Sequence, residues 1–170
     1  MKRVMIVGGP GSGKSTLAVA LGKITGLPVF HMDKFHHQPG WVGRPRADVV
    51  QLANNIEQKP QWILEGGLSD TYENRMSRAD TLIWLDLPVT LRMGRMLKRR
   101  FQFHGQTRPD LPENCRERLD PEFLAFIVRT RNTGREKIAQ AIAAAPHLDV
   151  QHIRTAKGAD TFLEWCREDA

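Results

Sequence analysis

The stretch GGPGSGKST, from Gly8 to Thr16, decides the fold. It follows the short apolar run at residues 4–7 and precedes apolar residues at helical spacing, so it joins a strand to a helix. The stretch matches the phosphate-binding pattern G-x-x-x-x-G-K-[ST] at Gly8, Gly13, Lys14 and Ser15. In such a loop, backbone N–H groups turn inward around phosphate oxygens and the helix N-terminus adds a positive dipole. The sequence therefore predicts a bound nucleoside triphosphate.

Individual positions of the loop have expected tasks. We expect Lys14 to place its charge on the β and γ phosphates of ATP, and Ser15 to hold Mg²⁺. The other expected ATP contacts in the loop are Gly8, Gly9, Pro10, Gly11, Ser12, Gly13 and Thr16. The alternative is a glycine-rich turn without a ligand, but a chance match in a chain of this length is about one per cent.

Outside the loop, short apolar runs alternate with helical patterns, which is typical of an α/β fold. Five runs are predicted strands, at residues 4–7, 28–32, 62–65, 81–87 and 148–153. Helical connections between them imply a parallel sheet covered on both faces, with ligands near the carboxyl ends of the strands. A long helix is expected from Asp120 toward Ala145. We expect one domain over residues 1–170.

Composition limits the class of protein. With 170 residues, of which 41% are hydrophobic and 26% charged, the chain has the composition of a globular protein. It has no apolar run of the roughly 18 residues that a membrane span needs and no signal-peptide pattern, so no membrane partner and a cytoplasmic location are expected. The formal charge of +6 favours anionic partners, either phosphorylated small molecules or nucleic acid.

Motifs elsewhere narrow the class of nucleotide-binding protein. The NKxD and DxxG motifs of GTPases and the LSGGQ signature of transporter ATPases do not occur in the sequence. What remains is a small kinase, with an acceptor pocket and an arginine-bearing lid. Arg92, Arg95 and Arg99 share one helical face, which would repel itself without an anion. The polar segment 102–120 is long enough to be the lid, and Arg131 beyond it is expected to face the phosphates.

Seven motifs together resemble the adenylate-kinase-related topology modulation family of bacterial P-loop proteins. They are GGPGSGKST, DKFHHQPGW (33–41), WILEGG (62–67), LIWLDLP (82–88), LKRRF (97–101), RPD (108–110) and ERLDPEFL (117–124). The resemblance covers nearly the whole chain. It implies a nucleoside-monophosphate-kinase-like fold with strand order 2-3-1-4-5 and a small lid. The family's name suggests an effect on DNA topology, whereas its motifs suggest phosphoryl transfer to a small acceptor.

The resemblance also implies roles for single residues. Arg95 and Arg99 match the arginines that open the lid of adenylate kinases and neutralise charge on the transferring phosphoryl. Glu65 stands where those kinases have an aspartate that holds metal-bound water; its alternative role is a helix cap or salt-bridge partner. Asp33 stands where shikimate-kinase-like proteins keep an aspartate that meets the acceptor. Either Glu65 or Asp33 is expected to hold the metal together with Ser15. Lys157 follows the fifth strand, where adenylate kinases surround the adenine.

The acceptor pocket is less well defined by the sequence. Its expected insert, about residues 33–60, is small and contains Trp41. The residues Gly66, Gly67 and Arg75 follow the third strand, where related kinases approach the acceptor. The sequence EGGLS stands there in place of the DGFPR of adenylate kinases, so the acceptor stays open.

The expected function is therefore a kinase that uses ATP and Mg²⁺ to phosphorylate a nucleotide-like or other small acceptor. Two alternatives stay open. One is a nucleotide-regulated DNA-binding protein, which the +6 charge and the cluster Lys98-Arg99-Arg100 permit. The other is an ATPase without a dedicated acceptor.

Overall fold

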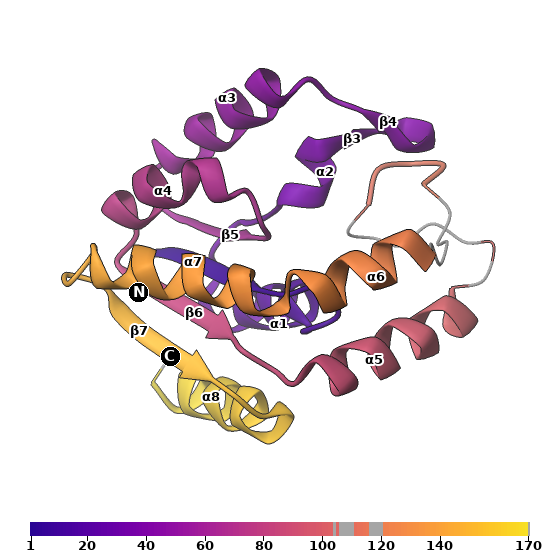
Figure 1. Cartoon of the computed structure of the whole chain (residues 1–170). Helices are drawn as coiled ribbons and strands as arrows, with labels where there is room; N and C mark the ends of the chain where they lie inside the picture. Colours follow the sequence, from indigo (N-terminus) through magenta and orange to yellow (C-terminus); the bar gives the residue numbers. More distant parts are fainter. Residues whose placement is uncertain (104, 106–110, 116–120, 170) are drawn as a thin grey trace.

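The core of the computed structural model, which describes residues 1–103, 105, 111–115 and 121–169, is a five-stranded parallel sheet (Figure 1). From one edge to the other its strands are β2 (Val29–His31), β5 (Trp62–Glu65), β1 (Arg3–Gly8), β6 (Thr81–Leu85) and β7 (Asp149–Ile153). Counted as the five predicted strands, this order is 2-3-1-4-5, so the predicted topology is confirmed. The labels differ because an antiparallel hairpin, β3 (His37–Gln38) and β4 (Val42–Gly43), lies between the second and third of them.

Helices cover both faces of the sheet, because each buried strand is apolar on both sides. On one face, side chains of β1 and β6 pack with α1 (Lys14–Thr25) and α8 (Ala156–Glu168). On the other face, alternate side chains of the same strands pack with α3 (Arg46–Glu57), α4 (Tyr72–Arg78) and α7 (Arg131–Ala143). The carboxyl ends of the strands are thereby left as the edge at which a ligand can approach.

The remaining elements surround that edge. They are α2 (Met32–His36), η1 (Pro39–Trp41), η2 (Ser69–Thr71), α5 (Val89–Gln102) and α6 (Pro121–Arg129). The predicted insert at about 33–60 consists of α2, the hairpin with η1, and α3. Much of the predicted lid at 102–120 lies outside the described residues, so the lid stays a prediction. Of the helices in the described part of the chain, none is long and apolar enough to cross a membrane.

The long helix predicted from Asp120 to Ala145 is wrong in one respect, because two helices, α6 and α7, take its place. They are separated at Thr130, which has φ −95° and ψ 6°. The Thr130 hydroxyl donates to the carbonyl of Phe126 at 2.7 Å, and the Thr130 backbone N–H uses the same carbonyl. A threonine that bonds back to the preceding turn bends a helix. Because of the break, α6 lies toward α5 while α7 covers the sheet (Figure 1).

Candidate active site

The loop between β1 and α1 has the backbone geometry of a phosphate site. Gly8, Gly11 and Gly13 have φ angles of 152°, 77° and 94°, which residues with a side chain rarely adopt. Gly13 precedes α1 and provides no side-chain cap, so the first N–H groups of α1 are left for another partner. A phosphate group is such a partner, because it is an anion at a helix N-terminus.

Side chains in the loop fit the same ligand. Lys14 Nζ donates to the carbonyl of Gly9 at 3.4 Å, a long bond to a neutral group that leaves the ammonium charge uncompensated there. The buried hydroxyl of Ser12 has no hydrogen-bond partner in the structure. Buried polar groups are normally satisfied, so this orphan also points to a polar ligand. The described residues of the predicted ATP site therefore fit a triphosphate.

Two arginines of α5 hold the outer side of the loop. Arg92 Nη1 donates to the carbonyl of Pro10 at 3.4 Å, and its Nε donates to the carbonyl of Leu87 at 3.2 Å. Arg95 Nη1 donates to the carbonyl of Ser12 at 2.9 Å. Burial lowers the pKa of Arg92 from its ordinary value, against the opposing effect of the nearby Asp86 carboxylate. Backbone carbonyls of the loop thus accept hydrogen bonds from both guanidinium groups. The sequence had suggested only an anion as their partner.

This packing explains two glycines that the phosphate pattern leaves unspecified. A Cβ atom on Gly9 would overlap the guanidinium of Arg92, and one on Gly11 would overlap the carbonyl oxygen of Arg92. Gly8 is restricted by the sheet instead, because its Cβ would lie 2.5 Å from the carbonyl oxygen of Leu85. Because Gly9 and Gly11 carry no side chains, α5 can pack closely against the loop and a phosphate group can approach its backbone.

The predicted metal ligands Ser15 and Glu65 are in direct contact. Ser15 Oγ donates to Glu65 Oε1 at 2.9 Å, and His31 Nδ1 lies 2.8 Å from the same oxygen. Hydroxyl and carboxylate oxygens are the ligands that Mg²⁺ prefers, so this pair fits that ion together with phosphate oxygens and water. Over the residues that the structure describes, His, Cys, Asp and Glu form no cluster of three that could hold a metal by themselves.

Asp86 joins three elements near the loop. Its carboxylate accepts from Arg135 of α7 at 2.8 Å and lies 3.1 Å from Nε2 of His152 of β7. The ring of His152 stacks on that of Trp84, with 4.1 Å between centroids and 2° between planes. Because both Asp86 oxygens are engaged by Arg135 and His152, this carboxylate anchors α7 to the strand ends.

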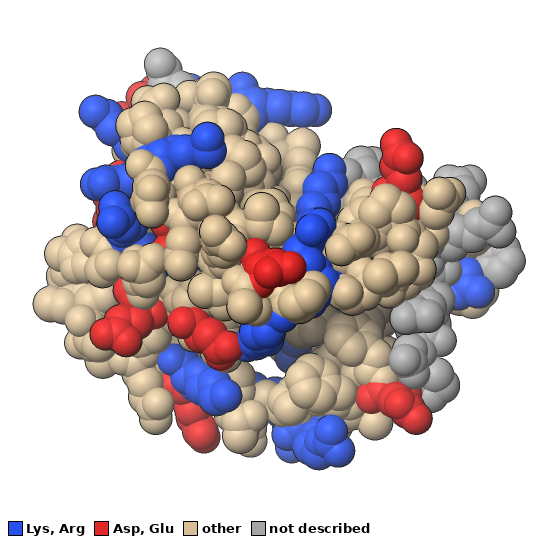
Figure 2. Space-filling view, turned by 90° about the horizontal axis from the view of Figure 1, so that it is seen from above, with Lys and Arg blue, Asp and Glu red and all other residues tan. Residues whose placement is uncertain are grey.

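A cavity of about 140 Å³ lies between the loop and α7. Gly9, Pro10, Asp86 and Arg92 line one side of it, and Arg131 with other α6 and α7 residues lines the other. Arg131 is exposed, and its Nη1 donates to the carbonyl of Val128 at 2.8 Å. Seen from above, some basic side chains form a band that is flanked by mostly uncharged surface, with acidic side chains beside it and further basic side chains elsewhere on this face (Figure 2).

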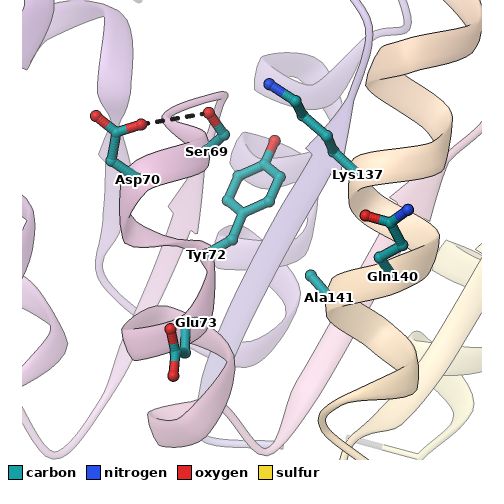
Figure 3. Close-up of a pocket in the computed structure, with 7 residues that line it drawn as sticks. All are labelled: Ser69, Asp70, Tyr72, Glu73, Lys137, Gln140 and Ala141. Atoms are coloured by element: carbon teal, nitrogen blue, oxygen red, sulfur yellow. Dashed lines mark hydrogen bonds between the residues drawn. The ribbon is translucent and has the colours of Figure 1, made fainter.

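A second, more open cavity of about 340 Å³ lies between α4 and α7 and does not touch the phosphate loop. In Figure 3, the Tyr72 hydroxyl and the Lys137 ammonium point toward the same space from opposite helices. Tyr72 lines both cavities, so the two adjoin at this ring.

The predicted acceptor residues lie around the β2 and β5 ends. Asp33 is exposed on α2, and Gly67 is exposed after β5. The α2 helix lies against this turn, because His36 Nε2 is 3.2 Å from the carbonyl of Gly67 and a Cβ on Gly66 would meet Met32. Trp41, with a φ of 64°, is half-buried in the hairpin region and packs edge-on against the His37 ring. The helix α2, which carries Asp33, therefore packs against the turn that contains Gly66 and Gly67.

The prediction that Arg75 contacts the acceptor is corrected by its position. The side chain is fully buried, and burial lowers its pKa. Its Nη1 donates to the carbonyl of Gly66 at 3.1 Å and its Nη2 to the hydroxyl of Thr71 at 2.9 Å. The guanidinium therefore fixes the turn after β5 from inside the protein.

Lys157 and Arg99 lie on α8 and α5, respectively. Lys157 is exposed in the first turn of α8, where Thr155 Oγ1 accepts the N–H of Gly158 at 3.0 Å and caps the helix. Arg99 lies one turn beyond Arg95 on α5 and is partly exposed. Thr16 is exposed on α1, so its side chain is not enclosed by the loop.

Sequence reasoning gave no role to His31, and it gave Arg92 an anion as its partner in place of the carbonyls of Pro10 and Leu87. A sequence signal existed for His31, because it is the last residue but one of the second predicted strand and Glu65 ends the third. Neighbouring parallel strands bring such end residues together. The partners of Arg92 are backbone carbonyls, which the sequence does not mark.

Comparisons with known proteins agree with this geometry. Residues 4–64 match the family described as ATPase family associated with various cellular activities (AAA). Protein YqaC of Bacillus subtilis (strain 168), described as uncharacterized, is 29% identical over 110 residues, which are 61% of this chain and 60% of that protein. The chain thus spans less than two thirds of that relative's length.

Solved structures give the fold. The shikimate kinase of Acinetobacter baumannii in complex with shikimate aligns with a TM-score of 0.58 and 16% identity, over 99% of this chain and 95% of that one. The shikimate kinase of Aquifex aeolicus aligns with a TM-score of 0.58 and 14% identity, over 98% and 94% of the two chains. This chain has a P-loop kinase fold.

Proposed function

We propose that this protein is a kinase that transfers the γ-phosphoryl group of ATP to a small hydroxyl or phosphate acceptor with the help of Mg²⁺. The observation that carries the proposal is the uncapped N-terminus of α1 within the glycine loop, with Lys14, Ser15 and Glu65 beside it. The P-loop kinase fold supports it. Membership of the topology modulation family stays a prediction.

Each part of the site has a task in the proposed reaction. The loop amides and Lys14 bind the triphosphate, and Ser15 with Glu65 would hold the cation. Mg²⁺, when bound, neutralises charge on the phosphate oxygens. Arg95, placed on the loop by its bond to Ser12, and Arg99 neutralise the charge that develops on the transferring group. Arg131 and Lys157 contribute to ATP binding from the outer parts of the site.

On the acceptor side, the exposed carboxylate of Asp33 would accept the hydrogen of an acceptor hydroxyl. Gly67 provides an exposed backbone surface that an acceptor can approach closely, because no atom lies within 4 Å of the place where its Cβ would be. Gly66 lies beneath it, packed against Met32. Trp41 forms the outer wall of this half. Arg75 keeps the turn in place from beneath.

An acceptor screen tests the proposal. The protein is supplied with ATP and Mg²⁺ and with nucleoside monophosphates, nucleosides, small polyols or hydroxy acids such as shikimate, and ADP formation is measured. We expect ADP formation to rise with one acceptor class, and Lys14→Ala to lower turnover by about 10²–10³-fold with an unchanged circular dichroism spectrum. Lys23→Ala, an exposed lysine in the last turn of the same helix, is the control and should keep full turnover.

Other outcomes would favour the alternatives. Turnover that depends on Lys14 but on no added acceptor would identify an ATPase. A salt-dependent mobility shift of duplex DNA that survives both Lys14→Ala and Arg95→Ala would favour a DNA-binding protein. Unchanged turnover in Lys14→Ala would remove the proposed mechanism.

A further inference from the structure

Two side chains from different elements donate to one carboxylate oxygen beside the phosphate loop. Glu65 Oε1 accepts a hydrogen bond from Ser15 Oγ at 2.9 Å and another from His31 Nδ1 at 2.8 Å. The side chain of Glu65 is only 3% exposed and that of His31 only 10%. Because water has little access to these atoms, the arrangement is set by the protein itself.

The sheet brings His31 to Glu65. The two residues are register partners in the parallel pair of β2 and β5, and each is the last residue of its strand. Register partners on adjacent strands project from the same face of a sheet. Their contact therefore requires no rearrangement of the backbone, and it lies at the edge where the phosphate loop begins.

The bond to Glu65 orients the hydroxyl of Ser15. A serine hydroxyl has one hydrogen to donate and two lone pairs with which to accept. Because its hydrogen is directed at Glu65 Oε1, the lone pairs of Ser15 are available to a cation. The carboxylate thus sets which side of the hydroxyl faces a metal ion.

Glu65 itself needs to be held for this purpose. A glutamate side chain loses rotamer freedom when it is fixed in one place, which opposes the arrangement. The bond from His31 favours the rotamer in which Oε1 faces Ser15. Since a carboxylate can only accept, Nδ1 of His31 carries the hydrogen in this contact.

We infer that His31 is a positioning residue that keeps Glu65 aligned on Ser15 and so sets the protein's affinity for the nucleotide-bound divalent cation. The inference rests on the proposed function, because it concerns the same cation. It assigns His31 no contact with ATP or acceptor. His31 is a hydrogen-bonding neighbour of the proposed metal ligand Glu65. Loss of such a neighbour typically weakens metal binding by about 10–100-fold.

The test measures binding without turnover. The affinity for a non-hydrolysable ATP analogue is measured by calorimetry in excess Mg²⁺ and in excess EDTA, and Mn²⁺ binding to the analogue complex is measured by electron paramagnetic resonance. We expect His31→Leu to reduce the affinity gained from Mg²⁺ by about 10–100-fold and to leave the affinity in EDTA unchanged. His31→Asn, whose amide nitrogen can take the place of Nδ1, should stay close to the wild-type protein. In a Glu65→Gln background, His31→Leu should cause little further loss.

The outcomes separate this inference from the proposed function. An undiminished Mg²⁺ effect in His31→Leu, or an equal loss in EDTA, would overturn the inference while the kinase proposal stands. A wild-type protein whose nucleotide binding is independent of divalent cations would overturn both. If His31→Leu does not fold, the wild-type protein still decides: the His31 ring should carry a hydrogen on Nδ1 in ¹H–¹⁵N spectra, and Glu65→Gln should change that signal. An Nε2–H tautomer in the wild-type protein would refute the inference.

Discussion

Glu57 and Arg75 form a charged pair inside the layer made by α3 and α4. Both side chains are inaccessible to solvent, and Arg75 Nε lies 4.0 Å from Glu57 Oε1. Asn74 donates to the other carboxylate oxygen of Glu57, while Oε1 itself has no hydrogen bond. Burial raises the pKa of Glu57 and outweighs the lowering effect of the Arg75 charge. The folded protein therefore holds the Glu57 proton more tightly than the unfolded chain does.

This pKa shift predicts a pH dependence of stability. The stabilising contribution of Glu57 protonation is fully present below the ordinary pKa of 4.5 and is lost as the pH rises through the higher folded pKa. We expect the unfolding free energy of the wild-type protein, minus that of Glu57→Gln, to fall as the pH rises above the ordinary pKa of 4.5. Urea denaturation at several pH values measures this difference. Glu73→Gln, at an exposed residue of α4, should show no such trend, and a flat or rising difference for Glu57 would contradict the assignment.

The sequence could not show that Arg75 is buried. Its position after the third strand and its charge made contact with an acceptor the natural expectation, because charged side chains are seldom buried without partners. The partners that permit burial are the carbonyl of Gly66, the hydroxyl of Thr71 and the carboxylate of Glu57, which come from three separate segments. Only the folded chain brings them together.

Among the elements, α5 and the phosphate loop form a unit. Arg92 and Arg95 donate to loop carbonyls, and the bare backbone at Gly9 gives Arg92 its space. The helix that carries the proposed charge-neutralising arginines is therefore attached to the loop that would hold the phosphates.

A double-mutant cycle measures this attachment. Gly9→Ala places a methyl group against the Arg92 guanidinium, so we expect nucleotide affinity to fall by about tenfold. In an Arg92→Ala background that obstacle is gone, and Gly9→Ala should then cost much less. Calorimetric titration with an ATP analogue provides the four affinities. Gly94→Ala on α5, where a Cβ meets nothing, should leave affinity unchanged and stabilise the helix by about 1 kcal/mol. Additive effects of Gly9→Ala and Arg92→Ala would contradict the coupling.

At the scale of helices and strands, the sequence predicted the elements that are determined by local patterns of residues. The phosphate loop and the five strands follow from short-range spacing, whereas the confirmed strand order was implied by the resemblance to the topology modulation family. The break at Thr130 and the hairpin at His37–Gly43 escaped prediction. The break depends on a hydrogen bond from the Thr130 hydroxyl to its own helix, and the hairpin depends on pairing between two strands of two residues each. The periodicity of apolar residues indicates neither of them.

At the scale of the whole molecule, the net charge of +6 favours an anionic ligand. Basic side chains gather in the band seen in Figure 2, and Arg131 lines the cavity next to the loop. We expect the affinity for an ATP analogue to fall as salt rises from about 0.05 M to about 0.5 M, because the Debye length shortens over this range. Arg131→Gln should weaken binding at low salt and flatten that dependence, measured by fluorescence titration. Lys23→Gln should do neither, and an equal effect of both substitutions would show that only net charge matters.

The β3–β4 hairpin is fastened to residues 111–115, a segment that lies far from it in sequence. Gly40 N–H donates to the carbonyl of Glu113 at 3.1 Å, and Trp41 N–H lies 3.3 Å from Cys115 Sγ. That thiol lies 3.6 Å from the carbonyl of Gln38. Separating the hairpin from residues 111–115 would break all three contacts together, at a cost of about 1 kcal/mol for each ordinary hydrogen bond. A displacement of the hairpin, for example by a bound acceptor, would therefore also displace residues 111–115.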